Sequence, residues 1–237
     1  MRPEIVVATR EGLASAAATR FEAAVRTAVS ERGRFSCALP GGSVAETFFP
    51  AFARLALPWE QVHVFFGDER AVPPTDPDSN LGLARRLWLA AVPAQVHPMP
   101  ADRDDLVAAA AAYAAELRAT LGEAPHLDLA LLGMGPDGHV CSLFPGHPLL
   151  HERTRWVAEI TDSPKPPPRR LTLTLPVLAS ARAIWVAAFG NAKAGMIREA
   201  IEDTRSQLPV ALAARSGPPA LFLLDPEAAS ALDRAAT

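Results

Sequence analysis

The chain is poor in cysteine and has no long hydrophobic run. Its 237 residues include two cysteines, Cys37 and Cys141, so we expect a reducing compartment and no disulfide framework. No segment approaches the roughly 20 apolar residues of a membrane-spanning helix, and residues 1–12 lack the apolar run of a signal peptide. We therefore expect a cytoplasmic protein without a membrane partner.

Lysine is just as scarce, and positive charge is not in excess. Lys165 and Lys193 are the two lysines, and the remaining strongly basic side chains are arginines. The formal net charge is −3, so no overall field attracts nucleic acid, and no nucleic-acid partner is expected. Any anion that the protein binds must therefore be recognised by a local arrangement of groups.

The chain is rich in apolar segments of two kinds. Apolar residues make up 49% of the composition, which is enough for a large core without disulfides or metals. Short strand-like runs occupy 4–9, 35–39, 61–67, 127–133, 156–160, 171–175, 183–189 and 220–225. Segments with a helical pattern lie at 11–31, from Ser43 onward, at 80–91, at 104–121, and after each of the last two runs. The run LTLTL at 171–175 alternates as a half-exposed strand does.

Strands that alternate with helices predict an α/β fold, with a mostly parallel sheet covered by helices on both faces. No internal repeat or long linker divides the chain, so residues 1–237 are expected to form a single domain. In such sheets the ligand site lies beyond the carboxyl ends of the strands. Polar or glycine-rich corners follow four of the expected strands, at 40–43, 67–70, 133–139 and 190–193. Core packing alone does not require this coincidence, so we expect a site at that rim.

The corner Gly41-Gly42-Ser43 has two interpretations. Glycines let backbone N–H groups approach a ligand, and a helix that begins at Ser43 would direct its free N–H groups and positive dipole end to the same place. Together these features would form an anion pocket. Residues Ser43 to Glu46 also follow the capping-box pattern S-x-x-E, which would explain Ser43 by helix stability alone. The two interpretations are compatible.

Two further corners carry cations. Lys193 lies in the first turn of an expected helix, where the dipole disfavours a cation unless an anionic ligand is bound; a solvated surface lysine is the alternative. Arg170 follows the rigid stretch 166–168, which suits the presentation of a guanidinium to a phosphate. Arg169 is adjacent, and the two-residue period of a strand sends the pair to opposite faces. One of the two arginines is therefore expected to point inward.

The corner at 67–70 places Asp68, Glu69 and Arg70 at a strand end. These residues either form a salt bridge within a loop or bring one carboxylate and Arg70 to a polar substrate. Downstream, Ser79 and Asn80 fit a helix cap, and Asn80 could also contact a ligand.

The corner GMGPDGH, residues 133–139, is the most informative. His139 is the one histidine in a functional setting, and an imidazole near its pKa can accept a proton from water at pH 7. Asp137 could orient the imidazole, bind substrate or stabilise the turn. No second histidine or cysteine stands at metal-ligand spacing, so a metal site is not expected. Cys141 lies close in sequence, but nothing else supports a nucleophilic thiol.

With these residues collected, the chain resembles the 6-phosphogluconolactonase family. Five blocks in family order carry the resemblance: PGGS, FFGDERAVPPTDPDSN, LLGMGPDGHVCSLFPG, KPPPRRLTLTLP and FGNAKA. The wider group includes glucosamine-6-phosphate deaminases and ribose-5-phosphate isomerases, which share a Rossmann-like fold and bind a sugar phosphate at the same rim. The resemblance implies hydrolysis of a phosphorylated sugar lactone, 6-phospho-D-glucono-1,5-lactone, to 6-phospho-D-gluconate in the oxidative pentose phosphate pathway. It implies no metal or organic cofactor, and we expect a monomer or weak homo-oligomer.

The resemblance also implies roles for the site residues. His139 would be the general base that activates water, and Asp137 would support its loop. Asp68, Arg70 and Asn80 would line the sugar end. The phosphate would be held by Gly41, Gly42, Ser43, Arg170 and Lys193.

Three positions depart from the family pattern. Val44 stands where many relatives carry threonine, so a hydroxyl contact to phosphate is expected to be missing, with backbone N–H groups in its place. Leu81 stands where an aromatic residue is common. Cys141 occupies a position often held by alanine, which argues against a catalytic thiol.

Two rival functions remain. An amino-sugar phosphate deaminase-isomerase requires ring opening and proton shuttling, and such relatives place a glutamate a few residues after the histidine. Residues 140–145 contain no acid, which disfavours this chemistry. A non-catalytic sugar-phosphate sensor is disfavoured because His139 is retained together with the phosphate ligands.

Overall fold

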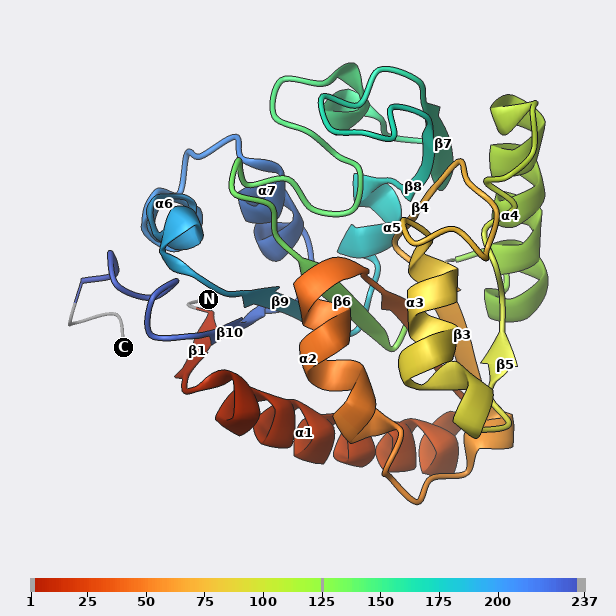
Figure 1. Cartoon of the computed structure of the whole chain (residues 1–237), viewed down its shortest axis with the longest axis horizontal. Coiled ribbons are helices and arrows are strands. Elements are labelled where there is room, and N and C mark those ends of the chain that lie inside the picture. The colour runs from red at the N-terminus through yellow and green to blue at the C-terminus, as the bar shows by residue number, and fades with distance from the viewer. Residues whose placement is uncertain (1–2, 125, 234–237) are drawn as a thin grey trace.

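The structure, a computed structural model that describes residues 3–124 and 126–233, is built on a parallel sheet (Figure 1). Its strands lie in the order β1-β10-β9-β6-β2-β3-β5, and each neighbouring pair is parallel. The strands are β1 (Glu4–Val7), β2 (Phe35–Leu39), β3 (Val62–Phe66), β5 (Gln95–Val96), β6 (Leu129–Gly133), β9 (Ile184–Ala188) and β10 (Leu221–Leu224). The expected mostly parallel sheet is confirmed.

Helices cover both faces of this sheet, as expected (Figure 1). On one face α1 packs against α2, and α2 packs against α3; on the other, α7 contacts α5, α6 and β9. The helices are α1 (Arg10–Arg32), α2 (Gly42–Phe52), α3 (Asn80–Leu87), α4 (Leu106–Leu121), α5 (Leu175–Ala179), α6 (Ala194–Glu202) and α7 (Pro209–Arg215). Short 3-10 segments are η1 (Trp59–Gln61), η2 (Leu89–Ala91), η3 (Pro148–His151) and η4 (Asn191–Lys193).

A second, smaller sheet departs from the sequence-based expectation. It consists of β4 (Asp68–Arg70), β8 (Arg170–Leu173) and β7 (Val157–Ile160), with β8 in the middle and both pairs antiparallel. Residues 68–70, expected in a loop, therefore form a strand. The helix α4 packs against β7 and β8.

Burial of β8 also differs from the expectation. Every residue from Arg170 to Leu173 is buried, so the prediction of a half-exposed strand is wrong. The polar residues of the alternating pattern face polar protein groups instead of water. Thr172 Oγ1, for example, accepts a hydrogen bond from Ser142 N at 3.1 Å. A two-residue period cannot distinguish a solvent-facing side from one that faces a buried polar network.

The segment after β10 is the third difference. A helix is expected there, but residues 226–231 form turns, and any helix in 234–237 lies outside the described residues. The Asp225 carboxylate accepts hydrogen bonds from Ala228 N at 2.8 Å and from Gly190 N at 2.9 Å. These bonds hold the turn and tie it to the corner that follows β9.

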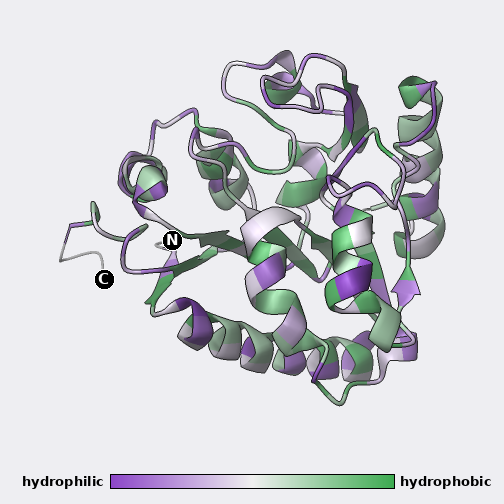
Figure 2. Cartoon of the chain, viewed as in Figure 1, coloured by the Kyte–Doolittle hydropathy of each residue, from purple (hydrophilic) through white to green (hydrophobic). Residues whose placement is uncertain are grey.

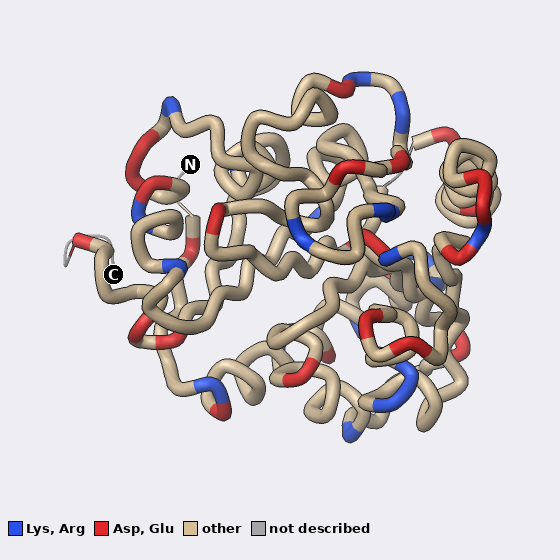
Figure 3. Tube along the Cα trace, turned by 45° about the horizontal axis from the view of Figure 1, so that its top comes forward, with Lys and Arg blue, Asp and Glu red and all other residues tan. Residues whose placement is uncertain are grey.

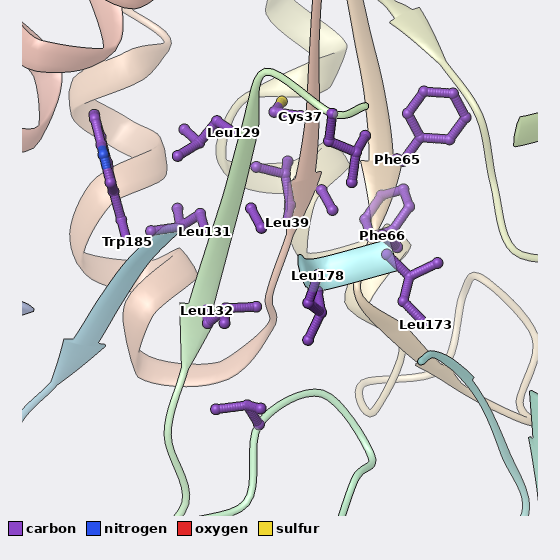
Figure 4. Close-up of a cluster of buried hydrophobic side chains, with 14 of the residues drawn as sticks. Cys37, Leu39, Phe65, Phe66, Leu129, Leu131, Leu132, Leu173, Leu178 and Trp185 are labelled. Atoms are coloured by element: carbon purple, nitrogen blue, oxygen red, sulfur yellow. The ribbon is translucent and has the colours of Figure 1, made fainter. Parts of the chain in front are cut away.

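The hydrophobic core lies between the sheet and its covering helices. Figure 2 shows apolar colours along the central strands, whereas the helices carry both polar and apolar faces. Figure 4 shows Leu39, Phe66 and Leu131, from three neighbouring strands, within one cluster of buried side chains. Between α1 and α2, Phe21 of α1 stacks on Phe52 of α2 with 4.4 Å between ring centroids.

Charged residues are dispersed over this fold. Figure 3 shows Lys and Arg interspersed with Asp and Glu along the whole trace. Within the described part of the chain, none of the helices combines the length and apolar character needed to pass through a bilayer.

The order of the strands determines where the polar corners meet. From β2 the chain proceeds outward to β3 and β5, and it then returns to β6, directly beside β2. From β6 it proceeds in the other direction to β9 and β10. The carboxyl ends of β2 and β6 therefore flank the topological switch point, which is where open α/β sheets bind their ligands.

We expect Phe21→Ala to lower the free energy of unfolding by about 3–5 kcal/mol, because it leaves a cavity in a packed aromatic cluster. Phe21 is fully buried, and its ring also meets Trp88 edge-on with 5.7 Å between centroids. Urea unfolding followed by circular dichroism measures the change. Val107→Ala is the control, because Val107 is 63% exposed and its loss should have little effect. Equal free energies of unfolding for the two variants would contradict the described packing around Phe21.

Candidate active site

A cavity of about 160 Å³ lies at the carboxyl ends of the central strands. Four separate corners of the chain contribute to its wall, as the sequence predicts. Nine of the ten predicted site residues line it: Gly41, Gly42, Ser43, Asp68, Arg70, Asn80, His139, Arg170 and Lys193. The tenth, Asp137, is hydrogen-bonded to His139.

The N-terminus of α2 forms one wall of the cavity. The helix begins at Gly42, Gly41 is its N-cap, and no side chain caps it. The capping-box interpretation of Ser43 is therefore wrong, because Ser43 lies inside the first turn. Gly42 has a φ of 62°, which L side chains rarely adopt, so the entry into this helix requires glycine. Residues 42–44 line the cavity with the uncapped, positive end of the helix.

His139 is positioned by its own loop. A Cβ on Gly135 would come within 2.1 Å of His139 Cε1, so the imidazole lies directly against that glycine. Asp137 Oδ1 is 2.5 Å from His139 Nδ1. An ionised carboxylate can only accept a hydrogen bond, so Nδ1 carries the proton and Nε2 keeps its lone pair. The side chain is 16% exposed.

Burial and neighbouring charges act on both members of this pair. Burial lowers the pKa of His139 below its ordinary value, and this effect outweighs the nearby Asp137 carboxylate, which raises it. Burial raises the pKa of Asp137, but the hydrogen bonds and charges of His139 and Lys165 outweigh it, so the pKa of Asp137 is lowered. At neutral pH the pair is a carboxylate beside a neutral imidazole, which is the protonation state of a general base.

Lys165 also belongs to this site, although it is not among the residues predicted from the sequence. Its Nζ lies 3.2 Å from Asp137 Oδ1 and 3.3 Å from His139 Nδ1. The scarcity of lysine could have indicated it, since the other lysine of the chain, Lys193, is among the predicted residues.

Asp68 is held by hydrogen bonds from separate segments. Its carboxylate accepts from Ser142 Oγ at 2.6 Å and from Asn80 Nδ2 at 3.1 Å, and Arg170 Nη1 lies 3.8 Å away. Asn80 Nδ2 also donates to the Asp68 carbonyl at 2.8 Å. The cap of α3 is Ser79, so Asn80 is the first helical residue and its side chain belongs to the cavity wall.

Glu69 serves the helix instead of the cavity. Its carboxylate accepts hydrogen bonds from Asn80 N and Leu81 N at 2.8 Å each, and from Ser79 Oγ at 3.1 Å. Burial raises the pKa of Glu69, and the backbone hydrogen bonds partly oppose this shift. Of the two adjacent carboxylates, Asp68 therefore reaches the cavity, and Glu69 stabilises the N-terminus of α3.

Arg170 points inward and Arg169 points outward, as the two-residue period predicts. Most N–H groups of Arg170 are engaged within the protein. Its Nε donates to Pro167 O at 3.0 Å, Nη2 donates to Lys165 O at 2.9 Å, and Nη1 lies 3.4 Å from Ser142 Oγ. Arg170 therefore braces the segment before β8 and keeps fewer donors for a ligand than the resemblance implies.

Arg70 and Lys193 have donors available. Arg70 Nε is buried, and no partner for it exists within the described residues. Burial lowers the pKa of Lys193, Arg10 and Lys165 lower it further, and Asp225 opposes the shift. A buried donor without a partner costs free energy until a ligand oxygen accepts from it. These two side chains are suited to an anionic or strongly polar ligand.

Cys141 is not activated. Burial raises its pKa well above the ordinary value, and a Cβ on Gly67 would lie 2.9 Å from its Sγ, so the thiol is tightly packed. In residues 3–124 and 126–233, no cluster of three or more His, Cys, Asp or Glu side chains is arranged to hold a metal ion.

Comparison with known proteins identifies the family. Residues 8–221 match the family described as "Glucosamine-6-phosphate isomerases/6-phosphogluconolactonase". The chain belongs to this family. The 6-phosphogluconolactonase of Mycobacterium tuberculosis is 42% identical over 232 residues, which cover 93% of this chain and 94% of the relative. That of Streptomyces coelicolor is 40% identical and covers 98% of this chain and 95% of the relative. The predicted family resemblance is confirmed.

The fold is that of this family as well. The solved structure of 6-phosphogluconolactonase from Trypanosoma brucei aligns with a TM-score of 0.87 at 30% identity, over 98% of this chain and 99% of that chain. The Rossmann-like fold expected from the resemblance is therefore confirmed.

We expect Gly135→Ala to displace the imidazole of His139, because the new Cβ would overlap the ring while Gly135 N stays bonded to His139 O at 2.9 Å. The free energy of unfolding should fall by about 1–3 kcal/mol, and the His139 side-chain NMR signals should shift. Gly195→Ala is the control, because a Cβ there meets nothing within 4 Å and α6 should gain up to about 1 kcal/mol. Unmoved His139 signals in Gly135→Ala would rule out the described loop.

Proposed function

We propose that the chain is a 6-phosphogluconolactonase, a carboxylic ester hydrolase that opens 6-phospho-D-glucono-1,5-lactone to 6-phospho-D-gluconate with His139 as general base and without a metal. The observation that carries the proposal is the imidazole of His139, bonded through Nδ1 to Asp137 and lining a cavity with available cations. Relatives of about 40% identity named 6-phosphogluconolactonase support this substrate. The reaction would belong to the oxidative pentose phosphate pathway in the cytoplasm.

The phosphate of the substrate would lie between the N-terminus of α2 and Lys193. The helix supplies uncapped N–H groups, and Lys193 supplies a half-buried cation. The sugar would lie against Asp68 and Asn80, whose positions are held by their mutual hydrogen bonds. Binding the remote dianion would place the lactone carbonyl next to His139, so that binding energy is converted into rate.

The chemistry requires one base and one group that stabilises negative charge. Nε2 of His139 takes a proton from water while the water oxygen bonds to the lactone carbonyl carbon. The carbonyl oxygen becomes an oxyanion, and Arg70, which lines the same cavity, is the cation assigned to stabilise it. The ring ester C–O bond then breaks, and His139 returns the proton to the departing oxygen, which becomes a hydroxyl group. The product acid ionises in water.

Asp137 supports both halves of this cycle. Its bond to Nδ1–H keeps Nε2 free to accept a proton, and its charge stabilises the imidazolium that forms briefly. General-base assistance supplies roughly 10²–10⁴-fold in rate, and an oxyanion donor adds roughly 10²–10³-fold. These two contributions suit a strained ester, which needs less assistance than an amide.

We expect His139→Ala to lower kcat by about 10²–10⁴-fold with little change in Tm, because the base is lost and the core is untouched. Lactone hydrolysis by the purified protein, corrected for the spontaneous reaction, measures this. For the wild type, kcat/KM should fall as the pH decreases through the pKa of His139, because imidazolium cannot accept a proton; burial places this pKa below its ordinary value. The exposed His151 provides the control variant His151→Ala.

Two outcomes would contradict the assignment. Comparable turnover in His139→Ala and His151→Ala would remove His139 from its role. Release of ammonia from glucosamine 6-phosphate, with no lactone hydrolysis, would favour the deaminase chemistry instead.

We expect Lys193→Ala to raise KM for the phosphorylated lactone by about 10–100-fold, because a charge-assisted hydrogen bond to the phosphate is lost. Unphosphorylated glucono-1,5-lactone should be hydrolysed as by the wild type. Arg198→Ala, which removes an exposed cation from α6, is the matched control. An equal effect of Lys193→Ala on both lactones would exclude Lys193 from phosphate binding.

A further inference from the structure

Two donor groups meet at one oxygen atom beside the cavity. Asp137 Oδ1 is 2.5 Å from His139 Nδ1 and 3.2 Å from Lys165 Nζ. The two donors are themselves only 3.3 Å apart. An ammonium group and a protonated Nδ1 cannot bond to each other, so they share the carboxylate oxygen. The charge of Asp137 is therefore already paired when His139 is neutral.

The backbone of Lys165 is anchored, although its side chain is 37% exposed. Ser163 Oγ donates to Lys165 O at 2.8 Å and accepts from Lys165 N at 3.2 Å. Arg170 Nη2 also donates to Lys165 O, at 2.9 Å. The inward-facing arginine of β8 thus fixes the segment from which Lys165 reaches Asp137.

The choice of lysine at this position is informative. Lys165 and Lys193 are the two lysines among 23 Lys and Arg residues, and both lie at this site. An ammonium is a compact point charge, whereas a guanidinium is a planar fork that favours bidentate contacts. A chain that otherwise uses arginine throughout has a compact cation next to the Asp137–His139 pair.

The charged groups that face His139 come from several elements. Burial lowers the pKa of His139 most, Asp137 on the same loop raises it, Lys165 lowers it, and Asp68 on β4 raises it. The cations that line the same cavity are Arg70 on β4, Arg170 on β8 and Lys193 in η4. Lys165 is the cation in direct contact with the Asp137–His139 pair.

We propose that Lys165 is a positioning residue that keeps His139 in its uncharged, base-competent form by sharing Asp137 Oδ1. The inference rests on the proposed function of His139 as general base. Without Lys165, the full carboxylate charge would stabilise a resting imidazolium, which cannot activate water. With Lys165 present, Asp137 still accepts a hydrogen bond from Nδ1–H and orients the ring. Its carboxylate charge, however, stabilises the imidazolium formed by protonation of Nε2 less strongly.

The pH dependence of lactone hydrolysis tests this inference. In Lys165→Met the acid limb of kcat/KM should move to higher pH. The comparison is made at a pH one unit below the midpoint of the wild-type acid limb. For each protein, kcat/KM at this pH is divided by that protein's own plateau value. This ratio should be about fivefold lower in Lys165→Met than in the wild type. Lys165→Arg keeps the charge and should restore most of the profile. Arg26→Met, which removes a cation paired with Glu22 on the distant part of α1, is the control and should leave the limb in place.

Other results would overturn the inference. A uniform loss of kcat/KM at every pH would make Lys165 merely structural. A rise in KM for the phosphorylated lactone with an unmoved acid limb would make it a phosphate ligand.

A second measurement does not depend on activity. NMR titration of the histidine side chains follows His139 directly, with its signals assigned by their loss in His139→Ala. The midpoint should lie at higher pH in Lys165→Met than in the wild type, Lys165→Arg and Arg26→Met. If the midpoint is unmoved and the enzyme is active, the role of Lys165 is rejected, but the proposed function is not. A moved midpoint in a protein without lactonase activity would reject the proposed function and keep the electrostatic effect of Lys165.

Discussion

The parallel pairing of β2 with β6 is the constraint on which the site depends. These strands are neighbours in the sheet although a long stretch of chain separates them, and both end at the same rim. The turn into α2 and the loop that carries His139 therefore face each other across one cavity. Because the chain reverses its direction of winding between these strands, no helix fills the space between their carboxyl ends. The cavity at this rim is the direct consequence of the strand order.

The small antiparallel sheet supplies the opposite wall and makes it rigid. Pairing of β4 with β8 brings Asp68 and Arg170 together, and Ser142 connects them through its hydroxyl group. Buried polar groups destabilise a fold unless they are hydrogen-bonded, and here the partners come from segments far apart in the chain. The network therefore holds the cavity wall in place before any ligand arrives, so that little reorganisation is needed on binding.

The cavity combines a neutral base with available positive charge. Burial favours the uncharged imidazole of His139, while Asp137 orients it without giving its whole charge to the ring. Arg70 Nε has no partner among the described residues, and Lys193 brings a half-buried ammonium to the same cavity. In a chain of formal net charge −3, such a local arrangement is what an anionic substrate requires, since no overall field attracts it. The same low dielectric that lowers the pKa of His139 strengthens each of these contacts.

The sequence by itself determined the α/β class, the family, and nine residues of the cavity wall, because strand ends, glycine corners and short motifs are local features. The two-residue period of the strand also predicted that one of Arg169 and Arg170 faces inward, but it did not decide which one. Only the tertiary structure decided that Asp68 reaches the cavity while Glu69 stabilises the N-terminus of α3. It also decided that Arg170 donates most of its N–H groups to the segment before β8, and that Lys165 contacts Asp137. These outcomes depend on the pairing of β4 with β8 and on where one loop lies against another, and no local pattern encodes contacts between segments so distant in the chain.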